Sequence, residues 1–234
     1  MEVFSRFLDL ERKRMGHLVI LGDLFEFFFG FRHFSSTQKD SDFTDYLPVF
    51  HQLGSLYREG IRIKYFEGNH DFFLHSFFSE QFGMEIEVYP DGCDERLEGK
   101  RVFIAHGDLS NPRQWTYRAF RKILKNSLSY RLIHFAGPRI SCRVARKLSD
   151  MSYQKYHNDQ HAPPPPFKAF AHRKFLEGFE IVILGHSHFP EEVEEWIDGR
   201  RCLYYNVGDW MVRRSFLRFT PPDQFRLERF IEAN

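Results

Sequence analysis

Five short apolar runs in this sequence each end in small and polar residues that can do chemistry. The runs begin at His17, Ile61, Arg101, Ile181 and Cys202, and each is long enough for one buried strand. The polar groups that follow them are Gly22-Asp23, Glu67-Gly-Asn-His-Asp71, His106-Gly-Asp108, Gly185-His-Ser-His188 and Gly208-Asp209. Because open α/β sheets keep their active sites at the carboxyl ends of the strands, the repeated pattern predicts a site built from these groups.

The side chains in these groups are typical ligands of a divalent metal ion. They offer one carboxylate, one amide oxygen and three imidazoles, from Asp23, Asn69, His106, His186 and His188. This mixture of nitrogen and oxygen donors suits Mn²⁺, Fe²⁺ or Zn²⁺ better than Ca²⁺, which takes oxygen ligands. A carboxylate can bridge two metal ions roughly 3.5–4 Å apart, an arrangement that holds both oxygens of an in-line phosphoryl displacement.

Two residues beside Asn69 extend this hypothesis. His70 can donate a proton to a leaving oxygen or stabilise the charge that develops on the phosphoryl group. Asp71 can orient His70 or hold the loop. A single Gly-Asp after a strand is usually only a turn, but the joint occurrence of the groups in this order favours a metal site.

Length and composition fit a single globular domain spanning residues 1–234. With 42% hydrophobic residues, the chain can bury a full core, and disorder is excluded. No apolar run approaches the roughly 18 residues needed to cross a bilayer, and the first residues lack a signal-peptide pattern. Cys93, Cys142 and Cys202 are scattered, which favours a reducing compartment, so we expect a cytoplasmic protein.

The apolar periodicity predicts an α/β (or α+β) fold, a sandwich of sheets flanked by helices. We expect helices over residues 2–15, 46–59, 72–82 and 167–177, strands over 17–20, 61–66, 85–88, 101–105 and 181–184, and hairpins over 193–207 and 215–230. A polyproline linker is expected over 163–166. A basic insertion over 111–161 is expected to form a helical hairpin that is interrupted at Gly137-Pro138.

The insertion concentrates positive charge. Between Arg113 and Lys155 there are eleven basic residues and one acid, a net charge of +10 in a chain whose total is +1. Such a block indicates an anionic partner, namely phosphate, nucleic acid or a lipid surface. An apolar stripe accompanies the charge, formed by Trp115, Phe120, Leu124, Leu128, Leu132 and Phe135. The alternative is a solvated basic helix that packs through this stripe.

Four of the motifs together resemble those of the calcineurin-like metallophosphoesterases. They are Leu21-Gly-Asp-Leu-Phe-Glu26, Gly68-Asn-His-Asp-Phe72, His106-Gly-Asp108 and Gly185-His-Ser-His188. Within that family the chain most resembles the bacterial UDP-2,3-diacylglucosamine diphosphatases (hydrolases) of lipid A biosynthesis. The features that carry this closer resemblance are Gly-Asp-Leu-Phe-Glu, Tyr117-Arg-Ala-Phe-Arg121, the basic insertion and Asn206-Val-Gly-Asp-Trp210. The resemblance covers the chain from Phe4 onward.

The resemblance implies a metallophosphoesterase-type β-sandwich and a hydrolase with two divalent metal ions, usually Mn²⁺. The implied reaction splits the pyrophosphate of UDP-2,3-diacylglucosamine into UMP and 2,3-diacylglucosamine 1-phosphate. By the family pattern Asp23 bridges the metals, Asn69, His106 and His186 complete one site, and His188 belongs to the other.

The resemblance also assigns a role to the basic insertion, as a lid over the substrate. The lid would hold the acyl chains and phosphates, with Arg146, Ser149 and Lys155 as substrate contacts. A basic amphipathic helix also suits peripheral attachment to the cytoplasmic face of the inner membrane. No nucleic-acid partner is expected, because the charge accompanies an apolar stripe rather than exposed stacking aromatics.

Two features depart from the family pattern. Many members carry Arg where His70 stands, so the exact substrate is less firmly implied. The family's first motif, Asp-x-His on a first strand, is not found before Asp23. One hypothesis is a misplaced start, and it predicts that the upstream codons read in frame into that motif. The other is a short relative of low activity, for which titration should give about one tight metal ion per chain.

Two further functions remain open at this level. One is another phosphoesterase, phosphodiesterase or nuclease of the same superfamily, whose affinity for nucleic acid would fall steeply with salt. The other is a catalytically impaired relative that binds a lipid or a nucleotide.

Overall fold

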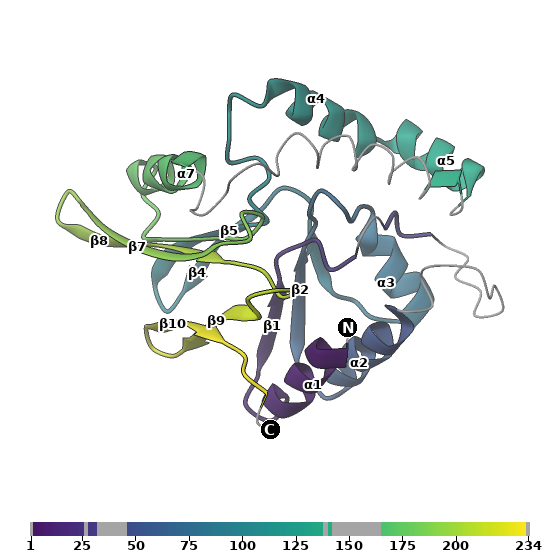
Figure 1. Ribbon diagram of the computed structural model, residues 1–234, viewed down its shortest axis with the longest axis horizontal. Coiled ribbons are helices and arrows are strands. Elements are labelled where there is room, and N and C mark those ends of the chain that lie inside the picture. The colour runs from purple at the N-terminus through teal and green to yellow at the C-terminus, as the bar shows by residue number, and fades with distance from the viewer. Residues whose placement is uncertain (1, 26–27, 32–45, 138–139, 142–164, 233–234) are drawn as a thin grey trace. The chain divides into compact units, whose positions relative to one another are not determined.

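The computed structural model describes residues 2–25, 28–31, 46–137, 140–141 and 165–232. The chain falls into two compact units. Unit 1 comprises Met1–Pro90 and Thr116–Asn158, and unit 2 comprises Asp91–Trp115 and Asp159–Asn234. Each unit has its own parallel strands and helices (Figure 1), and each carries some of the polar groups predicted to form the site.

Unit 1 is built on a parallel sheet with the strand order β1-β2-β3. The strands are β1 (His17–Ile20), β2 (Arg62–Phe66) and β3 (Glu87–Tyr89). The helices α1 (Glu2–Glu11), α2 (Leu47–Arg58) and α3 (Leu74–Phe82) lie beside β1 and β2 (Figure 1). Since α2 and α3 connect successive strands, they supply the crossovers that parallel pairing requires.

The core of unit 1 is rich in phenylalanine. Phe50 of α2 is fully buried, and its ring lies 5.0–5.1 Å from the rings of Phe25, Phe77 and Phe82. Aromatic rings at such separations add to the stabilisation that burial of their apolar surface provides. These four phenylalanines therefore pack together and fix α2 and α3 to the loop after β1.

Unit 2 is built on a mixed sheet with the strand order β4-β5-β6-β8-β7. Its strands are β4 (Cys93–Leu97), β5 (Lys100–Ala105), β6 (Ile181–Leu184), β7 (Pro190–Ile197) and β8 (Arg200–Val207). The three central strands are parallel, and β4 and β7 pair antiparallel at the edges. Ala105 pairs with Leu184, which pairs with Asn206, so the carboxyl ends of the central strands are level with one another.

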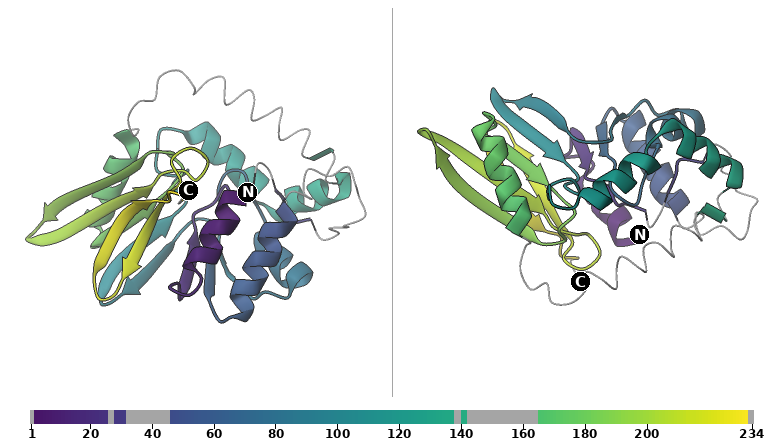
Figure 2. Two further views of the ribbon diagram at one scale, coloured as in Figure 1. Left: turned by 60° about the horizontal axis from the view of Figure 1, so that its bottom comes forward. Right: turned by 90° about the horizontal axis from the view of Figure 1, so that it is seen from above.

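A helix and a second sheet complete unit 2. The helix α7 (Pro165–Leu176) lies along the five-stranded sheet (Figure 2) and packs Ala171 and Phe175 into a core that includes Val182. The strands β9 (Ser215–Thr220) and β10 (Gln224–Arg229) form an antiparallel hairpin. Phe225 stacks on Tyr205 of β8 at 5.6 Å, which attaches the hairpin to the main sheet.

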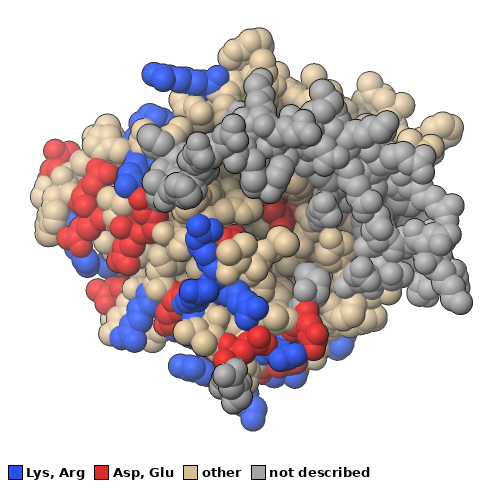
Figure 3. Space-filling view, in the orientation of Figure 1, with Lys and Arg blue, Asp and Glu red and all other residues tan. Residues whose placement is uncertain are grey.

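The edge strand β7 carries acidic side chains in two adjacent pairs, and acidic and basic residues lie together in this region (left in Figure 3). Each acid contacts a residue of α7 or β8. Glu191 pairs with Lys168, Glu192 accepts the Tyr205 hydroxyl, Glu194 pairs with Arg201, and Glu195 pairs with His172. Charges on an edge strand also oppose pairing with a second sheet edge.

Three local features differ from the expectations. The expected interruption at Gly137-Pro138 is found at Gly137, where α5 (Ser127–Ala136) ends, but the basic insertion also breaks earlier, between α4 (Trp115–Leu124) and α5, because the Asn126 side chain accepts the Leu128 and Ser129 N–H groups and starts a new helix. Pro165 and Pro166 belong to α7 rather than to a linker, since proline fits the first turn of a helix. The strand β4 was not predicted, because its sequence Cys-Asp-Glu-Arg-Leu is largely polar.

The predicted fold class, α/β with helices flanking sheets, is confirmed. Among the residues that the structure describes, none of the helices has the length and apolar character needed to cross a membrane.

Candidate metal centre

In unit 1 the loops that follow β1 and β2 meet at the Asp23 carboxylate. Its Oδ1 accepts hydrogen bonds from the backbone N–H groups of Asn69 and His70, both at 3.0 Å. A side-chain carbon at Gly68 would collide with the same carboxylate, so glycine is required for this approach. The structure thus brings Asp23 to Asn69 and His70, which lie 46 and 47 residues further along the chain.

The Asp71 carboxylate, which is fully buried, ties the two loops together. It accepts hydrogen bonds from the Gly68 N–H at 2.5 Å, from the Leu24 N–H at 3.3 Å and from the Tyr65 hydroxyl. Burial, followed by the negative charge of Asp71, raises the pKa of Tyr65 well above its usual value. Tyr65 therefore stays protonated and donates to Asp71, and Asp71 holds the loop, one of the two roles predicted for it.

Glu67, the residue before Gly68, anchors the same loop to the basic insertion. Its carboxylate accepts the Leu74 N–H at 3.0 Å and an ion pair from Lys125 of the insertion at 3.0 Å. The two side chains are only 6% and 11% exposed, and Lys125 also donates to the Pro90 carbonyl. Arg121 is buried and donates to this carbonyl too. These two cations therefore stabilise the fold of unit 1 rather than form a surface for an anionic partner.

In unit 2, two of the three predicted imidazole ligands face each other. His106 follows β5 and is 3% exposed, and His186 follows the neighbouring parallel strand β6. The distance between His106 Nε2 and His186 Nδ1 is 3.0 Å. Two imidazole nitrogens this close can share a proton, or both can bind one cation through their lone pairs.

The loop that carries His186 and His188 has an unusual backbone. Both histidines have φ of 61°, in the left-handed region, where a residue other than glycine costs about 1–3 kcal/mol. Hydrogen bonds at both ends fix this loop. The Gly185 N–H donates to the His106 carbonyl at 2.8 Å, and the Phe189 N–H donates to the Ser187 hydroxyl at 3.2 Å. Strain of this kind at predicted ligands is typical of a functional loop.

Asn206, at the end of β8, supports the loop from the other side. It is fully buried, and its Nδ2 donates to the Gly185 carbonyl at 2.9 Å and to the Tyr204 hydroxyl at 3.1 Å. Its Oδ1 accepts the Gly208 N–H at 3.2 Å. The sequence analysis noted the Asn206-Val-Gly-Asp-Trp210 motif but assigned no role to its asparagine. In the structure Asn206 connects β8 to the histidine loop.

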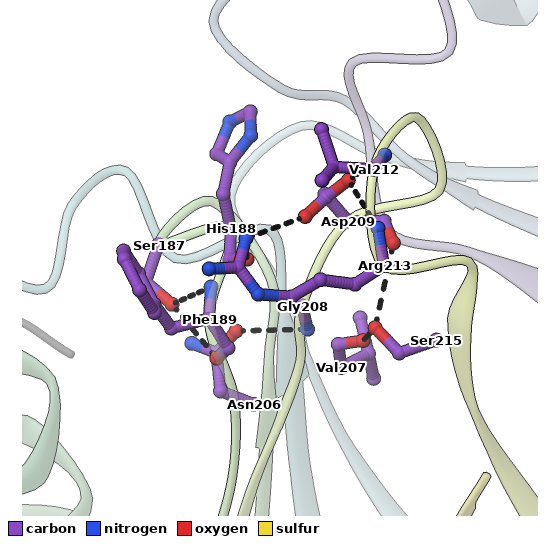
Figure 4. A network of polar contacts seen from close by, with 10 residues as sticks. All are labelled: Ser187, His188, Phe189, Asn206, Val207, Gly208, Asp209, Val212, Arg213 and Ser215. Atoms are coloured by element: carbon purple, nitrogen blue, oxygen red, sulfur yellow. Dashed lines mark hydrogen bonds and ion pairs between the residues drawn. The ribbon is translucent and has the colours of Figure 1, made fainter. Parts of the chain in front are cut away.

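The turn after Gly208 adds a second polar network to unit 2 (Figure 4). Asp209 accepts the backbone N–H groups of Val212 and Arg213, and its other oxygen pairs with the Arg213 guanidinium at 3.0 Å. Arg213 also donates to the His188 carbonyl at 3.0 Å. Asp209 belongs to one of the predicted polar groups but was given no role, and Arg213 was not singled out, because only the fold brings this turn to the histidine loop.

The predicted ligands therefore form two groups, one in each unit. Asp23 and Asn69 gather in unit 1, and His106 and His186 pair in unit 2, with His188 two residues further along the same loop. The predicted substrate contacts of the insertion, Arg146, Ser149 and Lys155, lie outside the described residues.

The donor chemistry of both groups fits a divalent cation. The imidazoles of His106 and His186 have ring nitrogens directed at each other at 3.0 Å, and the Asp23 carboxylate is held in place by two backbone N–H donors. A carboxylate and imidazoles that are held in this way are ligands for the borderline transition metals rather than for Ca²⁺.

Carboxylate, amide and imidazole side chains at the ends of parallel strands are typical of metal-dependent hydrolases, and comparison with known proteins bears on this class. No protein-family model matches the chain. Curated relatives do match it: the chain is homologous over most of its length to proteins named UDP-2,3-diacylglucosamine hydrolase. The resemblance to these hydrolases seen in the motifs is thereby confirmed.

Three of these relatives show the extent of the similarity. The Aeromonas salmonicida protein is 29% identical over 232 residues, which cover 96% of this chain and 84% of the relative. The Yersinia pseudotuberculosis protein is 28% identical, with 93% and 87% covered, and the Azotobacter vinelandii protein is 29% identical, with 88% and 82% covered. A solved archaeal phosphodiesterase is 13% identical, and its alignment covers 98% of this chain and 92% of that protein with a TM-score of 0.43.

The anchor between Glu67 and Lys125 gives a direct test of the role of the insertion in unit 1. Lys125→Met leaves the Glu67 carboxylate buried without its cation, so we expect the free energy of unfolding to fall by about 3 kcal/mol. Denaturant titration followed by circular dichroism measures the loss. Lys122→Met, at an exposed position in the last turn of α4, just before Lys125 in the sequence, is the matched control and should change stability little. Equal stability of the two variants would contradict the anchoring role.

Proposed function

We propose that the protein hydrolyses the pyrophosphate bond of UDP-2,3-diacylglucosamine and releases UMP and 2,3-diacylglucosamine 1-phosphate. The observation that carries this proposal is the similarity to hydrolases named for that substrate over nearly the whole of this chain and most of theirs. The position of every motif at the carboxyl end of a parallel strand supports it, since ligand sites of α/β sheets lie there.

The proposed metal ligands are those expected from the sequence. By the family resemblance Asp23, Asn69, His106, His186 and His188 would hold two divalent ions, with Asp23 as the proposed bridge and Mn²⁺ as the proposed metal. Bound ions of this kind polarise phosphoryl oxygens and lower the pKa of a coordinated water. The hydrogen bonds from the Asn69 and His70 N–H groups support the role of Asp23, because they fix the carboxylate in one orientation.

His70 is the proposed catalytic side chain. Its backbone N–H is bonded to the Asp23 carboxylate, so the residue is held next to the proposed bridging ligand. From there its imidazole would donate a proton to the leaving oxygen or stabilise the charge on the phosphoryl group. The buried Asp71 keeps the loop in this position through the Gly68 and Leu24 N–H groups.

The insertion is the proposed lid and membrane contact. Its described helices α4 and α5 expose large apolar side chains: Trp115 is 72% exposed, Leu128 64% and Phe135 93%. Exposed basic residues, including Arg118, Lys122 and Arg131, accompany them. This combination suits acyl chains and an anionic lipid surface better than nucleic acid. We propose Arg146, Ser149 and Lys155 as further substrate contacts, and the cytoplasmic face of the inner membrane as the location.

The proposed reaction can be tested by measuring UMP released from UDP-2,3-diacylglucosamine in the presence of Mn²⁺. We expect His106→Ala to lower the rate by roughly 100-fold or more, since it removes a metal ligand. His172→Ala, an exposed histidine of unit 2 that pairs with Glu195, should leave the rate unchanged. The assay includes a version extended at its N-terminus by an Asp-x-His strand. No UMP release by either form would overturn the proposed function, and a normal rate for His106→Ala would overturn the ligand set.

The proposed membrane contact can be tested by sedimentation with phosphatidylglycerol vesicles and with neutral phosphatidylcholine vesicles. We expect binding to the anionic vesicles that weakens as salt is raised, because basic residues near such a surface contribute about 1 kcal/mol each. Phe135→Ser should weaken binding, and Trp196→Ser, which removes an exposed aromatic side chain from β7 of unit 2, should not. Equal binding to both kinds of vesicle would argue against the electrostatic contact.

A further inference from the structure

We infer that Asp209 and Arg213 are positioning residues that hold the His188 imidazole in the orientation needed to bind a metal ion. The inference rests on the proposed function, in which His188 is a ligand. It goes beyond that function by assigning a role to a turn to which the motifs assign none. The two residues lie after β8, Asp209 pairs with Arg213, and the Arg213 side chain contacts the loop after β6 (Figure 4).

Asp209 is the fixed point of this arrangement. Its side chain is only 6% exposed, and both carboxylate oxygens are in use. Oδ1 accepts the Val212 N–H at 2.5 Å and the Arg213 N–H at 3.2 Å, while Oδ2 pairs with Arg213 Nη1 at 3.0 Å. The carboxylate therefore closes the turn and orients the arginine that ends it.

The guanidinium of Arg213 carries this constraint to the histidine loop. Its Nη1 donates to the His188 carbonyl at 3.0 Å, and the guanidinium carbon lies 4.3 Å from the centre of the Phe189 ring. The hydrogen bond fixes the peptide between His188 and Phe189, and the cation–π contact fixes the side chain that follows it. Arg213 thus holds the backbone on the C-terminal side of His188.

The His188 ring depends on that backbone. In Figure 4 the imidazole points away from the Asp209–Arg213 pair, and among the residues that the structure describes no hydrogen bond or ion pair to this ring is found. His106 and His186, in contrast, have ring nitrogens 3.0 Å apart. With φ of 61° at His188, the ring direction is set by a backbone conformation that few residues adopt, and Arg213 is the side chain that donates to its carbonyl.

The turn that carries Asp209 and Arg213 is also held by contacts of Gly208 and Ser215, which do not involve the guanidinium. Gly208 lies where a side chain would collide with Ser215 and Pro190, and the Ser215 hydroxyl donates to the Val207 carbonyl at 2.6 Å. The turn is therefore held in place by backbone packing as well as by Asp209. A change confined to the guanidinium can release the His188 carbonyl without dismantling the turn.

The test is a titration of the ¹⁵N-labelled chain with Zn²⁺, in which the ring nitrogens of the histidines are followed by NMR and His188 is assigned from His188→Gln. Zn²⁺ is diamagnetic, and coordination shifts the ring nitrogen directly. We expect Arg213→Met to raise the Zn²⁺ concentration needed to shift His188 about 10- to 100-fold, the usual effect of losing a residue that orients a ligand. The responses of His106 and His186 should stay close to those of the wild type.

Three further variants make the result decisive. Arg213→Lys restores a donor and should recover much of the response. Asp209→Asn keeps an acceptor for the turn but removes the ion pair, so it should show an intermediate response even if Arg213→Met folds poorly. Arg201→Met, which breaks the exposed pair with Glu194 in the same unit, is the matched control and should behave like the wild type.

Two results would overturn the inference, and they differ in meaning. If His188 shifts with Zn²⁺ equally in the wild type, Arg213→Met and Asp209→Asn, the turn does not position the ring, and the proposed function stands. If the His188 ring does not shift in the wild type at any Zn²⁺ concentration, its proposed role as a ligand fails, and the positioning role fails with it.

Discussion

Parallel strand pairing is the constraint on which the candidate site depends. In unit 1, Ile20 pairs with Tyr65, and in unit 2, Ala105, Leu184 and Asn206 pair in a row. A shift of one residue in either register would turn every side chain of a strand to the opposite face. The polar groups that follow neighbouring strands of a sheet would then no longer lie next to each other. The register of the buried strands therefore positions these groups before any ligand binds.

Buried carboxylates hold the loops that these strands deliver. Asp71 accepts two backbone N–H groups and a tyrosine hydroxyl, Glu67 accepts a backbone N–H and an ion pair, and Asp209 accepts two backbone N–H groups and an arginine. Burial of a charge is costly unless it is paired and hydrogen-bonded, and each of these groups meets that condition. The proposed metal ligands lie on the loops that these carboxylates stabilise.

The basic residues of the insertion fall into two groups, one bonded within unit 1 and one exposed to solvent. Arg121 and Lys125 face the interior of unit 1 and bond to the Pro90 carbonyl, while Arg118, Lys122 and Arg131 face solvent beside exposed apolar side chains. A count of charges cannot separate these roles, because lysine and arginine on one helix can serve either a buried carboxylate or a partner. Lys122 and Arg131 are the exposed cations that the proposed lipid contact would use.

The sequence by itself determined the strand-end motifs, the α/β class and the ligand types. Short apolar runs followed by glycine and polar residues, when they recur in one chain, indicate buried strands that deliver polar groups to a site. The tertiary structure decided what no local pattern contains: that Asp71 joins two loops 47 residues apart, that Lys125 reaches Glu67, and that Arg213 bonds to His188. These contacts arise from strand order and register, which bring distant segments together. A single sequence contains the residues that form such contacts but not the pairing that brings them together.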